Sequence, residues 1–97
     1  MRTINWLQYR QLFHVLKTHG FREVPNRKAR VFFHDATGAE LILAPVADDD
    51  AVVSYHYGAA QMEVVDYGIM TRESFDLALL SAAHKTPAEA VAAPTMG

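Results

Sequence analysis

The stretch FREVPNRKARVFFHDATGAELILA, residues 21–44, decides the fold of this chain. Turn-forming residues at 25–28 (PNRK) and 36–38 (ATG) divide it into three short runs that are rich in β-branched and aromatic side chains: 21–24, 29–35 and 39–44. Such runs, joined by short turns, are typical of β-hairpins. The stretch therefore predicts a three-stranded antiparallel meander that ends before Pro45.

Helical periodicity precedes the meander. Residues 5–19 carry apolar side chains at spacings of three and four: Trp6, Tyr9, Phe13 and Leu16. This spacing predicts an amphipathic helix. Thr3 or Asn5 is a suitable N-cap, and Gly20 can adopt the left-handed conformation that commonly ends a helix.

The chain beyond the meander also contains helical patterns. Residues 51–55 form either a short edge strand or an extended connection after the acidic turn 48–50. Apolar positions from residue 57 onward predict a helix that ends at Gly68, and a last helix is expected over residues 72–83. The expected fold class is α+β, in the order α-β-β-β-α, with helices on one face of the sheet and water on the other.

Length and composition restrict the possibilities further. A chain of 97 residues that is 51% hydrophobic and 21% charged predicts one globular domain, over residues 1–85, followed by a flexible tail over residues 86–97. Without cysteine, neither disulfides nor a thiolate site is expected, and a cytoplasmic location is the default. No apolar run is long enough to cross a membrane. No phosphate loop and no metal-ligand spacing occurs, so neither a cofactor nor a metal is expected.

Alternation along the middle run determines which side chains the open sheet face displays. Val31, Phe33 and Asp35 point to one face, whereas Arg30, Phe32 and His34 point to the other. The opposite register would bury Phe32. We expect the second set to be displayed, so that a cation, an aromatic ring and an imidazole lie in a row.

Cations are concentrated in the first half of the chain. Residues 1–46 hold seven Lys and Arg against three acids, and residues 47–97 hold two against eight. The candidate binding residues for RNA or for a protein partner are those of the basic hairpin: Arg27, Lys28, Arg30, Phe32 and His34. Cations contact phosphate, and an exposed ring can stack on an unpaired base.

Several short motifs occur in a characteristic order: residues 16–21 (LKTHGF), 26–28 (NRK), 31–34 (VFFH), Gly38, 41–45 (LILAP) and 62–75 (MEVVDYGIMTRESF). In this order the chain, over residues 9–80, resembles the HicA toxin family. The resemblance implies a fold like that of double-stranded RNA-binding domains, an RNA target and an antitoxin-like protein partner.

One position departs from the family pattern. The resemblance implies that messenger RNA is cleaved by a histidine at the start of the second strand, and this chain has Ala29 and Arg30 there. Neither residue can act as a general acid or base near neutral pH. We therefore expect a HicA-like binding domain without ribonuclease activity. The alternatives are a toxin whose catalytic group has moved to His34, and a protein-interaction module.

Overall fold

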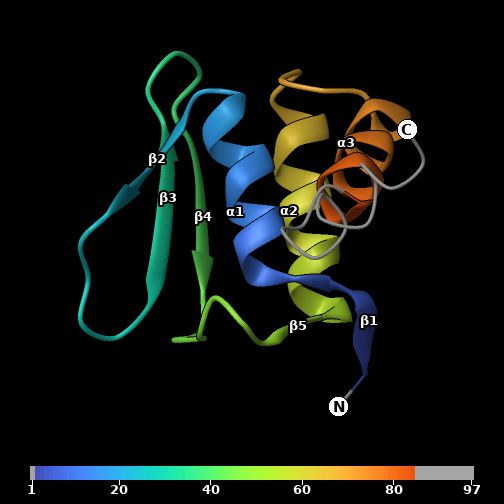
Figure 1. Ribbon diagram of the computed structural model, residues 1–97. Helices are drawn as coiled ribbons and strands as arrows, with labels where there is room; N and C mark the ends of the chain where they lie inside the picture. The colour runs from blue at the N-terminus through green and yellow to red at the C-terminus, as the bar shows by residue number, and fades with distance from the viewer. Residues whose placement is uncertain (1, 85–97) are drawn as a thin grey trace, which may run out of the picture.

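The computed structural model describes residues 2–84, and the predicted tail over residues 86–97 lies outside this range. Three helices and five strands follow one another along the described chain (Figure 1): β1 (Thr3–Gln8), α1 (Tyr9–Thr18), β2 (Phe21–Val24), β3 (Arg30–His34), β4 (Ala39–Leu43), β5 (Ala51–Val53), α2 (Ser54–Asp66) and α3 (Arg72–His84).

The predicted meander is confirmed. Strands β2, β3 and β4 form one antiparallel sheet in that order, and Phe32 of β3 lies opposite Glu23 on one side and Leu41 on the other. Figure 1 shows the sheet with α1 and α2 against one face, α3 beyond them, and the other face open. The fold class is therefore α+β, as the sequence predicts.

The start of the first helix differs from the prediction. Residues 3–8 form strand β1, which pairs antiparallel with β5, and the helix begins at Tyr9. Backbone carbonyls of Asp50 and Asp48 accept the N–H groups of Tyr9 and Arg10 at 3.1 and 3.0 Å. The distant segment 48–50 thus satisfies the first two N–H groups of α1, while the side chain of Gln11 accepts the N–H of the N-cap residue Gln8 at 2.9 Å. Trp6, expected on the buried stripe, is 50% exposed.

Downstream elements agree more closely with the sequence. Residues 51–55, for which the sequence allows either a short edge strand or an extended connection, contain strand β5. Helix α2 begins three residues earlier than expected, at Ser54, and α3 runs over Arg72–His84 as predicted. Thr71 caps α3, because its hydroxyl accepts the N–H of Ser74 at 3.1 Å.

The core lies between the sheet and the helices. Rings of Phe13 and Phe32 pack with their centroids 4.6 Å apart, which joins α1 to the middle strand. From the last helix, Phe75 and Leu79 are fully buried. These contacts hold the meander in a fixed position against α1, and this sets the orientation of the basic hairpin.

Candidate functional site

The loop between β2 and β3 displays two of the five candidate residues. Arg27 and Lys28 are exposed, and neither forms an ion pair with another residue in the described range 2–84. The carboxamide oxygen of Asn26 accepts the Lys28 N–H at 2.8 Å, which orders the loop in an Asx turn. The pair therefore lies exposed on a loop that contains this one local hydrogen bond.

The side chain of Arg30 lies on the face of the hairpin that packs against α1. Its guanidinium donates to Glu23 at 2.6 and 3.2 Å, to Asp48 at 3.2 Å and to the carbonyl oxygen of Val46 at 2.8 Å. It also lies 4.6 Å above the ring of Phe13. These contacts raise the pKa of Arg30, first of all through the bond to Glu23. Arg30 is thus not free to bind phosphate.

The expectation that Phe32 lines the open face is wrong. The ring is fully buried beneath α1. The helices therefore cover the face of β3 that was expected to be open. Phe33 lies on the open face instead, where the guanidinium of Arg22 covers it at 5.4 Å. Arg22 also donates to Asp35 at 2.8 and 3.2 Å and so lowers the pKa of that carboxyl. The open face therefore displays no uncovered aromatic ring from β3.

His34 is likewise buried, and the expectation that it lines the surface is wrong. Its Nε2 lies 2.9 Å from the carbonyl oxygen of His19, which can only accept, so Nε2–H donates. Its Nδ1 then accepts from the hydroxyl of Thr37 at 2.8 Å. Both ring nitrogens are engaged, so neither can take a proton from a substrate hydroxyl unless a bond to the protein breaks.

The structure also contains a buried polar pair that was not predicted from the sequence. Tyr9 and His56 share a hydrogen bond of 2.6 Å between the hydroxyl oxygen and Nδ1, and the same hydroxyl accepts the Val53 N–H at 3.1 Å. Burial raises the pKa of Tyr9 and lowers the pKa of His56. The only sequence signal was the tyrosines beside His56, because Tyr9 is 47 residues away.

The depressed pKa of His56 predicts sensitivity to acid. An unfolded chain protonates this imidazole near its ordinary pKa of 6.5, whereas the folded chain resists the proton. The unfolded state then binds more protons, so the free energy of unfolding should fall as the pH drops below 6.5. Urea unfolding between about pH 7 and about pH 5 measures this.

The matched control replaces an exposed histidine. His56→Asn should flatten the pH dependence across this interval, and His14→Asn should leave it as in the wild type. Equal curves for wild type and His56→Asn would contradict the assignment.

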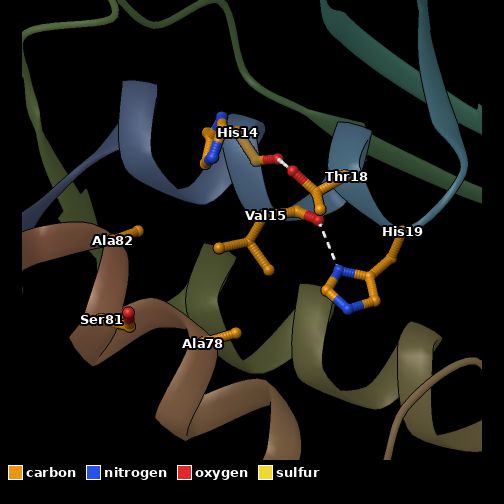
Figure 2. Close-up of a pocket in the computed structure, with 7 residues that line it drawn as sticks. All are labelled: His14, Val15, Thr18, His19, Ala78, Ser81 and Ala82. Atoms are coloured by element: carbon orange, nitrogen blue, oxygen red, sulfur yellow. Dashed lines mark hydrogen bonds between the residues drawn. The ribbon is translucent and has the colours of Figure 1, made fainter. Parts of the chain in front are cut away.

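Two histidines on or directly after α1 line a hollow between α1 and α3 (Figure 2). The hollow has a volume of about 170 Å³ and includes His14, His19 and Ser81. Nδ1–H of His19 donates to the carbonyl oxygen of Val15 at 2.9 Å, and Val15 lies between the two imidazoles in the picture. The described residues contain no cluster of His, Cys, Asp or Glu that could hold a metal ion.

Among residues 2–84, each helix is too short or too polar to cross a bilayer. No family model, curated protein or solved structure matches this chain.

Proposed function

We propose that this chain is a HicA-like binding domain without ribonuclease activity, and that it contacts RNA through the loop between β2 and β3. The observation that carries the proposal is the exposed pair Arg27 and Lys28. Elsewhere on the hairpin and on α1, arginines are paired with carboxylates: Arg10 with Asp49, Arg22 with Asp35, and Arg30 with Glu23 and Asp48. The loop pair is the part of the hairpin whose positive charge remains available to a polyanion.

The loop suits contact with phosphate more than contact with bases. Because Phe32 is buried and Phe33 is covered by Arg22, no ring of β3 is free to stack on an unpaired base. Binding through two cations alone depends on the RNA backbone and carries little sequence information. We therefore expect weak binding without sequence preference, in a chain whose net charge is −2.

The contacts of His34 and Arg30 argue against the alternative of a toxin whose catalytic group has moved to His34. His34, the residue that would have to replace the missing catalytic histidine, donates to His19 and accepts from Thr37. Ala29 and Arg30 stand where the family has its histidine, and the side chain of Arg30 contacts Glu23, Asp48, Val46 and Phe13. None of these groups is an imidazole. RNA incubated with this chain should therefore stay intact.

Fluorescence anisotropy with a labelled single-stranded oligouridylate tests the loop. Two phosphate contacts predict that log affinity falls with log salt with a slope of about −1.4, a loss of about sevenfold between 50 and 200 mM salt. The double variant Arg27→Ala/Lys28→Ala should remove both the binding and the salt dependence.

A matched control removes the same charge elsewhere. Arg2→Ala/Lys17→Ala also deletes two exposed cations and should bind within about twofold of the wild type. Equal losses in the two double variants would show that net charge, and not the loop, governs binding. Cleavage of the RNA by the wild type but not by His34→Ala would instead establish the toxin alternative.

A further inference from the structure

The acidic segment 48–50, in the connection between β4 and β5, lies close to the basic loop between β2 and β3. Figure 1 shows this connection, the loop and the start of α1 at the same end of the molecule. Asp48 links them, because its carboxylate accepts from Arg30 at 3.2 Å and its backbone carbonyl oxygen accepts the Arg10 N–H at 3.0 Å. Arg30 follows Lys28 by only two residues. Arg10 is therefore a cation at the same end of the fold as the basic loop.

The backbone of this segment and the side chain of Asp49 do different things. The backbone carbonyl oxygens of Asp48 and Asp50 accept the first N–H groups of α1, which other residue types could do equally well. The carboxylate of Asp49 forms an ion pair with the guanidinium of Arg10. Both side chains are largely exposed, 76% for Asp49 and 47% for Arg10. Because exposed ion pairs add little to stability, the fold needs the backbone of this segment more than it needs the charge of Asp49.

Two of the three carboxylates of the segment are placed on arginines. Asp48 contacts Arg30 and Asp49 contacts Arg10, whereas Asp50 accepts the N–H of Ala47 at 3.1 Å within its own turn. The segment therefore lowers the positive potential at the end of the molecule where the basic loop lies. Its carboxylates occupy guanidinium groups that could otherwise contact phosphate.

We propose that Asp49 limits RNA binding by pairing with Arg10, and that opening of this pair adds Arg10 to the binding surface of Arg27 and Lys28. This role of Asp49 rests on the proposed function of the loop. Phosphate, like carboxylate, is a bidentate acceptor for a guanidinium, so an RNA phosphate can take the place of Asp49. Arg30 does not join the surface, because its ion pair with Glu23 is independent of the acidic segment.

Anisotropy titrations of the full chain with a labelled single-stranded oligouridylate test this role. Asp49→Asn keeps the size of the side chain and removes its charge, so Arg10 becomes a third phosphate contact. The slope of log affinity against log salt should then steepen from about −1.4 to about −2.1. The affinity at 50 mM salt should rise at least about threefold. Asp49→Asn/Arg10→Ala should return both quantities to their wild-type values.

Asp35→Asn is the matched control. It also releases an exposed arginine from an aspartate, because Arg22 and Asp35 form an ion pair in which both side chains are more than half exposed. Asp35 directly follows β3, whereas the basic loop precedes β3, so this pair lies at the opposite end of the hairpin. The control should keep a slope of about −1.4 and an affinity within about twofold of the wild type.

Failure of this role and failure of the loop give different results. An Asp49→Asn chain that binds no better than the wild type, or equal gains for Asp49→Asn and Asp35→Asn, would overturn the role of Asp49. A carboxylate that only complements the positive end of α1 would lower the Tm when removed and would leave the salt slope unchanged. If the loop itself is not the binding site, the Arg27→Ala/Lys28→Ala chain will bind RNA as the wild type does.

Discussion

Replacing Phe32 by alanine should lower the free energy of unfolding by about 3–5 kcal/mol. The side chain is fully buried, and its ring packs 4.6 Å from the ring of Phe13, centroid to centroid, at the contact between β3 and α1. Removing it leaves a cavity that the sheet and the helix cannot fully close. Urea unfolding followed by circular dichroism measures the loss.

The neighbouring residue provides the control. Phe33 is on the same strand but points to the open face and is only half-buried, so Phe33→Ala should cost about 1–2 kcal/mol. If the Phe32→Ala chain kept its stability but bound RNA more weakly, Phe32 would not be buried beneath α1. Its ring would then be exposed and able to stack on a base.

Replacing Gly20 by alanine should lower the free energy of unfolding by about 3 kcal/mol. Two costs add at this position. Gly20 has a φ angle of +98°, where a Cβ is strained by about 1–2 kcal/mol. The new Cβ would also lie 2.8 Å from Nε2 of His34, the atom that donates to the carbonyl oxygen of His19. His34 would have to move, and about 1–2 kcal/mol of hydrogen bonding would be lost.

Gly38 separates these two costs. Its φ angle is +81°, but a Cβ there meets nothing within 4 Å. Gly38→Ala should therefore show the backbone strain alone, about 1–2 kcal/mol. If thermal unfolding gives equal losses for Gly20→Ala and Gly38→Ala, the imidazole of His34 does not pack against Gly20 as described.

The meander could be predicted because its signals are local. Alternating β-branched and aromatic residues form the strands, and turn formers at 25–28 and 36–38 fix the hairpins. The C-terminal end of α1 and the start of α3 at residue 72 were also predicted. Gly20, which follows α1, acts on backbone groups only a few residues away.

The candidate site was predicted only in part. Arg27 and Lys28 are exposed on a turn, as their position between two strands implies. The same reasoning placed Arg30, Phe32 and His34 on the open face, because alternation divides a strand into two sets without saying which set the helices cover. Charge patterning likewise could not reveal that Glu23 and Asp48 neutralise Arg30.

By itself, the sequence determined the order of the helices and of the three meander strands, the antiparallel pairing of those strands and the absence of a histidine at the start of β3. Each of these depends on residue identity or on neighbours a few positions away. Only the tertiary structure decided that residues 3–8 form a strand, because that strand requires β5 for its hydrogen bonds. It also decided which cations remain free, because that depends on carboxylates brought close by contacts between distant segments.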